Sequence, residues 1–292
     1  MLEPVLSAVA PVLAIAALGY IWTRFGGTLD ALTVTALVAD IGTPCLVVAT
    51  FAHTSIVPEA FAKTALAAVT AVACFAGSGA LALKLAGLRL RTFLPSLAFP
   101  NAGNLGLPLA LYAFGPEGLG YAIVFFAFTS IGNNTIGQAI AAGSANWRTL
   151  ARMPIIYAVV LGIGVSYWHV TLPRWIDNTI TMIAGLVVPL MLLMLGAALG
   201  RLKVRAFGRA ALVSAFRIGL GAGTGWLVAL LYGIDGAARA VVILQCAMPV
   251  AVYNYLFAQR YNNQPEEVAG AVVVSTLASV ITLPLLLGWL LR

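Results

Sequence analysis

Apolar runs of about 20 residues follow one another along almost the whole chain, separated by short breaks with turn-forming or charged residues. A helix needs about 20 apolar residues to cross a bilayer. Composition agrees, because 62% of the 292 residues are hydrophobic and 9% are charged, whereas soluble domains average about 45–50% and about 25%. The pattern therefore predicts an all-α integral membrane protein.

Ten membrane-spanning helices account for these runs. Their expected bounds are 2–23, 31–52, 60–86, 92–114, 118–143, 149–168, 176–200, 208–232, 236–259 and 267–291. Little length is left for a soluble domain, and the sequence has no HExxH, no GxSxG, no phosphate-binding glycine loop and no cysteine–histidine metal spacing. We therefore expect a protein that is not an enzyme and that has no cofactor and no metal site.

The basic residues orient the spans. Their scatter between apolar runs argues against a nucleic-acid partner, despite a pI near 9.6. Eleven fall on one side: Arg24, Lys84, Arg89, Arg91, Arg148, Arg152, Arg201, Lys203, Arg205, Arg209 and Arg260. Four fall on the other: Lys63, Arg174, Arg239 and Arg292. Because cytoplasmic loops are enriched in Lys and Arg, both termini are expected outside.

The two halves of the chain resemble each other. At shifts of 145 to 150, the segment 76–79 falls on 222–225, Pro44 meets Pro189, and Pro100 meets Pro249. Each half would hold five spans, an odd number, so the halves would have opposite orientations. The prediction is a five-plus-five inverted repeat, residues 1–146 and 147–292, which is typical of secondary transporters.

The fourth expected span carries the strongest local signal. The segment Phe99–Pro108 contains two prolines, two glycines and two asparagines. Proline and glycine disfavour a continuous helix, and broken backbone at membrane depth occurs only where it is buried or lines a wet cavity. We expect a substrate site here, formed by Asn101 and Asn104 with Pro100, Gly106 and Pro108.

The ninth span is expected to supply the partner of this break, through Pro249 and Asn254. Interrupted spans at corresponding positions of two halves are the best sequence pointer to a transporter site. In the fifth span, Asn134 and Gln138 share a helix face, which fits either substrate lining or contact between helices.

Two charged residues lie inside expected spans. Asp40 and Arg217 are each about 14 Å from the expected cytoplasmic end, and intramembrane charges normally have a partner or water. Three interpretations are open: an Asp40–Arg217 ion pair, Asp40 as a proton-coupling acid, or Arg217 as an anion anchor.

The combined motifs resemble those of the auxin efflux carrier family, which includes bacterial malonate-type carriers and plant auxin exporters. The family pattern P-N-x-x-x-G-[IL]-P resembles the segment 100–108, where Pro100, Asn101, Gly106, Leu107 and Pro108 match it with four residues instead of three between Asn101 and Gly106. Similar segments are 189–197, 248–261 and 275–284. The resemblance covers essentially the whole chain. One difference is the loop between the halves, which is long in plant members and here spans only about 144–148.

The resemblance implies ten helices in the fold of bile-acid sodium symporters, with spans 4 and 9 crossing at the substrate site. It also implies a scaffold of spans 1, 2, 6 and 7, a transport unit of the other six, elevator-type alternating access, and a homodimer.

The functional hypothesis is a secondary transporter of a small organic anion, such as malonate or an auxin-like carboxylate, in the inner membrane of a bacterium. A channel and a membrane sensor or partner subunit are the alternatives. The substrate, the direction of transport, and coupling to H⁺, to Na⁺ or to neither are left open by the sequence.

Overall fold

The computed structural model describes residues 2–28, 30–54, 58–143, 151–202, 204 and 206–291. Within these ranges every regular element is a helix, apart from an isolated antiparallel bridge between Pro100 and Val250. The loop around 144–148 and four residues of the charge count, Arg148, Lys203, Arg205 and Arg292, lie outside the described residues.

The helices vary widely in length. They are α1 Leu2–Arg24, α2 Ala31–Leu37, α3 Thr43–His53, α4 Pro58–Leu85, α5 Leu90–Ala98, α6 Leu107–Gly132, α7 Gln138–Ala142, α8 Pro154–Tyr167, α9 Arg174–Arg201, α10 Phe207–Leu231, α11 Gly236–Cys246, α12 Val252–Arg260 and α13 Pro265–Leu290. Three π-helical turns adjoin them: η1 Val38–Gly42, η2 Ala102–Gly106 and η3 Asn133–Gly137.

Seven helical runs in the described part are long and apolar enough to cross a membrane. They are Glu3–Arg24, Thr33–His53, Pro58–Leu85, Ala102–Ala142, Arg174–Arg201, Phe207–Leu231 and Pro265–Leu290. Two further apolar helices, α8 and α11, are shorter. This is the architecture of an all-helical, multi-pass membrane protein.

The count of seven differs from the ten expected spans for local reasons. The expected span 236–259 is divided between α11 and α12, and the expected span 92–114 is interrupted after α5. The rest of that span runs on through α6, which bends at Gly115 with φ 68° and ψ −162°. A positive φ favours glycine. Gly115 and Pro116 lie between the expected spans 92–114 and 118–143, so the bend falls where a boundary between two spans was predicted.

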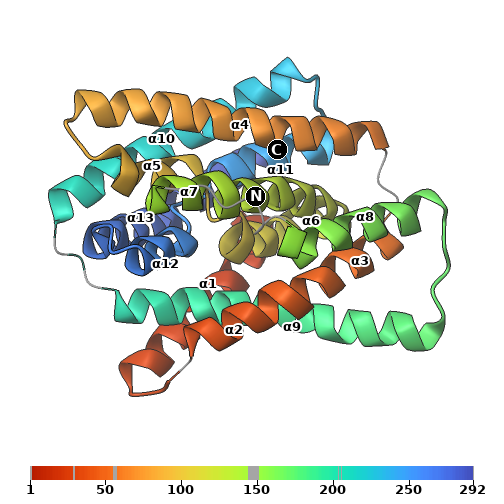
Figure 1. Cartoon of the computed structure of the whole chain (residues 1–292). Helices are drawn as coiled ribbons and strands as arrows, with labels where there is room; N and C mark the ends of the chain where they lie inside the picture. Colours follow the sequence, from red (N-terminus) through yellow and green to blue (C-terminus); the bar gives the residue numbers. More distant parts are fainter. Residues whose placement is uncertain are drawn as a thin grey trace.

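The helices pack in two groups. Helix α1 packs along α9, and α3 packs against both α8 and α9. Helix α10 packs on α11 and α13, whereas α4 packs on α5 and α6. In Figure 1, α3 and α9 run along the lower side, α4 and α10 run along the upper side, and α6 and α7 lie between them.

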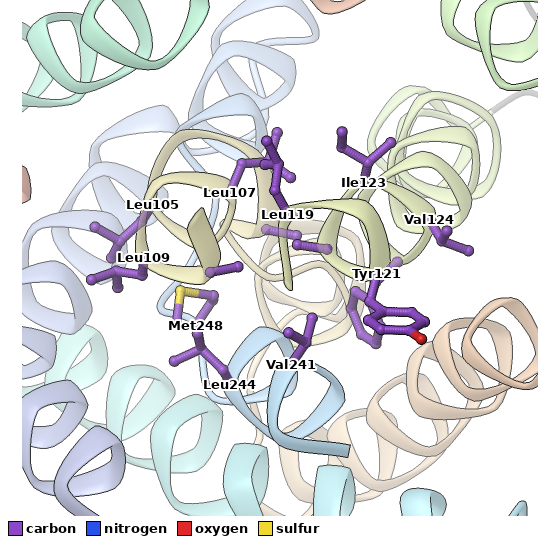
Figure 2. Packing of buried hydrophobic residues seen from close by; sticks show 14 of the residues in the cluster. Leu105, Leu107, Leu109, Leu119, Tyr121, Ile123, Val124, Val241, Leu244 and Met248 are labelled. Carbon is purple, nitrogen blue, oxygen red and sulfur yellow. The ribbon is translucent and has the colours of Figure 1, made fainter. Parts of the chain in front are cut away.

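Much of the buried core lies where α6 meets α11. Figure 2 shows Val241 and Leu244 of α11, together with Met248 just after it, on the side that faces α6. These three side chains are fully buried, as are Leu107 and Leu109 at the start of α6. The packing holds the region after α11 firmly against the region before α6.

Two glycines let α1 and α9 approach closely. A Cβ atom on Gly196 would lie 1.8 Å from the carbonyl oxygen of Ala16, and one on Gly19 would lie 2.1 Å from that of Leu193. Small residues permit such backbone contact between membrane helices, where packing rather than the hydrophobic effect drives association.

Replacement of Gly196 by Val should separate α1 from α9. We expect a loss of about 1–3 kcal/mol of stability, as for other overpacked sites, measured as a lower thermal midpoint of the protein in detergent. The matched control is Gly185→Val on the same helix, because a Cβ atom there has no neighbour within 4 Å. Equal midpoints for the two variants would contradict the close packing of α1 on α9.

Candidate functional site

Two interrupted helices cross at the centre of the site. Helix α5 ends at Ala98 and helical structure resumes at Ala102, whereas α11 ends at Cys246 and α12 begins at Val252. The backbone N–H of Asn101 donates to the carbonyl oxygen of Pro249 at 2.8 Å. We call the segments 99–101 and 247–251 the two breaks.

Proline explains why both segments of the chain leave helical geometry here. Pro100 and Pro249 have no N–H to donate, and a proline disfavours helical geometry in the residue before it. Phe99 is accordingly extended, with φ −114° and ψ 109°. The N–H of Val250 donates instead to Ser275 Oγ on α13 at 3.1 Å. The interruptions predicted in both segments are therefore present.

A cavity of about 230 Å³ lies beside the crossing. Part of its lining comes from α2, η1, α3, α9 and the segment at the start of α8. The rest comes from the two breaks, η2, α6, η3 and α12. Its polar and charged lining residues are Thr35, Asp40, Thr43, Asn101, Asn104, Thr129, Ser130, Asn133, Asn134, Arg152 and Tyr253.

All three π-helical turns contribute to this lining. Asp40 belongs to η1, Asn104 to η2, and Asn133 and Asn134 to η3. A π turn inserts one extra residue into a helix, re-aims the side chains around it, and is frequently found at functional sites. The turns thus bring polar side chains from three places in two helical runs, Thr33–His53 and Ala102–Ala142, to one cavity.

Asn101 has the most informative environment of the predicted site residues. Its side chain is 4% exposed, and its Nδ2 has no hydrogen-bond partner. A buried donor without a partner carries a free-energy cost of about 1–3 kcal/mol, so this amide is available to an acceptor in the cavity. Pro100 and Asn104 also line the cavity.

The other predicted substrate residues divide into two sets. Asn134 lines the cavity and donates from Nδ2 to the carbonyl oxygen of Ser130 at 2.9 Å. Pro249, Gly106 and Pro108 are buried and outside the lining, where Pro249 supplies the acceptor at the crossing. Gly106 packs against Gln245, whose side chain occupies the space that a Cβ atom would need.

Asn254 and Gln138 lie outside the lining and bond to other parts of the protein. Asn254 Nδ2 donates to the carbonyl oxygens of Pro95 at 3.2 Å and Phe99 at 3.3 Å, which ties α12 to the end of α5. Gln138 Nε2 donates to the hydroxyl of Tyr261 at 2.6 Å. Their amides therefore join helices in this structure.

Asp40 and Arg217 are not paired with each other. Asp40 is exposed at the cavity, in η1. Arg217 is 1% exposed and directs its guanidinium to the carbonyl oxygens of Leu97, Cys246 and Met248. The ion pair considered from equal depth is absent, and Arg217 does not line the cavity as an anion anchor would.

Sequence reasoning missed several lining residues. Tyr253, Thr43 and Met191 come from three different elements and reach the cavity only through the tertiary fold. Tyr253 lies next to Asn254, so the polar segment that follows Pro249 was the available signal. Ser130 lies four residues before Asn134 on the same helix face, and Thr129 and Asn133 lie in the same polar part of the expected fifth span.

The sequence also matches a family model described as membrane transport protein, over residues 4–145 and 138–287. The chain belongs to the auxin efflux carrier family. This is a family of membrane transporters and not of enzymes.

Individual members of the family are 27–32% identical to the chain over the segments that align with it. An uncharacterized transporter of Methanothermobacter thermautotrophicus is 28% identical over 195 residues, which are 64% of each chain. An uncharacterized transporter of Methanocaldococcus jannaschii is 27% identical over 220 residues, 71% of this chain and 69% of its own.

Plant members match over a smaller share of their length. Auxin efflux carrier component 3a of Oryza sativa subsp. japonica is 32% identical over 149 residues, which are 48% of this chain and 24% of the rice protein. The chain therefore spans about a quarter of that relative, and 64% of the first archaeal relative.

Replacement of Asn254 by Ala should lower stability, because the carbonyl of Phe99 loses its donor and that of Pro95 keeps only the N–H of Phe99. We expect a loss of about 1–3 kcal/mol, measured as a lower thermal midpoint in detergent. The control is Asn178→Ala, since Asn178 is exposed near the start of α9. An unchanged midpoint for Asn254→Ala, together with lost substrate affinity, would restore Asn254 to the substrate site.

Proposed function

We propose that this protein is a secondary transporter that carries a small organic anion by alternating access. The observation that carries the proposal is the buried, unpartnered Nδ2 of Asn101, which lies in a polar cavity where two interrupted helices cross. Interrupted helices form the substrate sites of many transporters. Membership of a transport family supports the same function.

The cavity favours a small anion. Its volume of about 230 Å³ is below the range of about 300–1,000 Å³ that drug-sized ligands occupy. The helical runs that follow the two breaks begin beside the cavity, at η2 and α12, and helix starts favour negative charge. Arg152 adds a positive charge to the lining. A compact carboxylate, such as malonate or an auxin-like acid, fits these features.

We further propose ten membrane-spanning segments arranged as an inverted repeat of residues 1–146 and 147–292. The two breaks support the repeat, because Pro100 and Pro249 occupy corresponding places in the two halves. The breaks are joined by the bridge between Pro100 and Val250 and by the bond from Asn101 to Pro249. In this assignment α2, η1 and α3 form one span, as do α5, η2 and the first arm of α6, and also α11 and α12.

An elevator-type movement is the proposed mechanism. The scaffold would consist of α1, α2–α3, α8 and α9, and the transport unit of α4–α7 and α10–α13. The lining of the cavity supports this division, because it comes from both groups of helices. Substrate held at such a boundary could change sides when one group slides along the other. We expect the scaffold to form a homodimer.

The charge distribution gives the proposed direction of opening. Cytoplasmic loops carry the excess of basic residues, which would put the start of α8 on the cytoplasmic side and both termini outside. Arg152 and Pro154, near this start, line the cavity. The structure would then correspond to an inward-facing state in a bacterial inner membrane.

Replacement of Asn101 by Ala should weaken transport and leave the fold intact, because the bond at the crossing uses the backbone N–H of Asn101. We expect KM to rise by about tenfold to a hundredfold, because a hydrogen bond to a charged group contributes about 1.5–3 kcal/mol of binding free energy. The measurement is uptake of labelled carboxylates, malonate among them, into proteoliposomes, with Asn178→Ala as the control.

Wild-type liposomes that take up no carboxylate, with folded protein, would contradict the proposed transport of an organic anion. Thermal stabilisation by a carboxylate without flux would then favour a sensor, and uptake that does not saturate would favour a channel.

Replacement of Asp40 by Asn tests its role in coupling. Asp40 is a carboxylate in the cavity lining, and an anion would meet less repulsion if this group bound a proton. If Asp40 couples proton and substrate movement, the Asn variant should lose its dependence on an imposed pH gradient while it keeps downhill exchange. Full gradient dependence in Asp40→Asn liposomes would exclude Asp40 as the coupling acid.

A further inference from the structure

Arg217 is a fully buried side chain whose positive charge has no acidic partner. Its exposure is 1%, and the ion pairs in the described part of the chain do not involve it. Burial of an isolated charge is costly, so such a group must be compensated by hydrogen bonds or dipoles. The compensation for Arg217 comes from the backbone.

Three carbonyl oxygens converge on its guanidinium. Nη1 donates to Leu97 at 3.0 Å, Nη2 to Cys246 at 2.6 Å, and Nε to Met248 at 3.1 Å. Leu97 lies in the last turn of α5, Cys246 is the last residue of α11, and Met248 lies in the following break. The last carbonyls of a helix have no partner within it, so one side chain satisfies both interrupted helices.

The electrostatics of the two helix ends explain how a charge is tolerated here. Each helix carries a partial negative charge at its C-terminal end, equivalent to about half an elementary charge. Two such ends meet at the crossing, and a single cation between them offsets both. The ring of Phe75 on α4 covers the guanidinium from another side, with its centroid 4.1 Å from Cζ.

A glycine in α10 places the Arg217 side chain close to the end of α11. Gly221 lies one turn after Arg217, and a Cβ atom on it would lie 2.6 Å from the carbonyl oxygen of Cys246. The backbone of α10 therefore runs directly against the end of α11. This close approach to α11, together with the direct contact of α10 with α5, brings Arg217 within reach of both helix ends.

We propose that Arg217 is a built-in cation at the helix crossing, which takes the place that a coupling sodium ion would need. In transporters, unwound carbonyls and the C-terminal ends of half-helices are the groups that coordinate Na⁺. Here the guanidinium already donates hydrogen bonds to the carbonyl oxygens of Leu97, Cys246 and Met248. This inference rests on the proposed transport function and adds that transport does not require sodium.

The first test removes sodium from the wild-type protein. Saturable uptake of labelled malonate, or of another carboxylate that gives uptake, is measured in proteoliposomes with Na⁺ on both sides and then with N-methylglucamine in its place. We expect the two rates to agree within a factor of about two, far less than the tenfold change that 1.36 kcal/mol produces. A rate that collapses without Na⁺ would overturn the proposal.

The second test removes the guanidinium and returns it from solution. Arg217→Ala should lower the thermal midpoint and reduce uptake by about tenfold or more. Millimolar guanidinium should restore part of both, whereas urea, which has a similar shape and no charge, should not. The matched control is Arg209→Ala on the same helix, because Arg209 is exposed and pairs with Glu267.

Equal recovery with urea and guanidinium, or no recovery with either, would overturn the built-in cation. If Arg217→Ala does not fold, the comparison of Arg217→Lys with Arg217→Met decides: the Lys variant should retain more stability because it keeps the charge, and equal losses would contradict the proposal. These stability measurements need no flux. A failure of the transport hypothesis, seen as absent wild-type uptake, is therefore distinguishable from a failure of the cation assignment.

Discussion

Backbone N–H and C=O groups have no water to bond to inside a bilayer, so a helix that is interrupted there must find other partners. This protein interrupts two helices at one place and satisfies the freed groups with one another and with a few side chains. Asn101 donates its N–H to Pro249, and Val250 donates to Ser275. Asn254 serves two carbonyls of the α5 region, and Arg217 serves three more. The arrangement of the surrounding helices follows from these bonds.

The same bonds leave few side-chain donors at the crossing without a partner. Most donors near the crossing are committed to backbone acceptors, whereas Asn101 Nδ2 is not. Rigid surroundings hold this amide in place, because its own backbone is fixed at the crossing. A transporter has to bind its substrate and then release it. A few unpartnered donors, held in place by a fixed backbone, suit both steps.

The sequence predicted the features that depend on local backbone chemistry. Prolines 100 and 249 indicated both interruptions, Gly115 indicated the bend in α6, and the motifs indicated the family. The three π turns could not be predicted, since each depends on how its helix packs over several turns. For the same reason Asn101 and Asn254, each close after a proline, look alike in sequence, although Asn101 lines the cavity and Asn254 ties α12 to α5. The position of Arg217 within its expected span predicted its depth in the membrane. Its three carbonyl partners belong to other helices and could be identified only from the tertiary structure.

The bond between the two breaks joins main-chain atoms, and this has a consequence for evolution. A main-chain hydrogen bond persists when side chains change, so neighbouring positions such as Asn104 or Tyr253 can be exchanged without uncoupling the crossed segments. Recognition can then diversify while the frame stays constant. Paralogues could then transport chemically different substrates after a few substitutions in the cavity lining, while the main-chain bond between the two breaks stays the same.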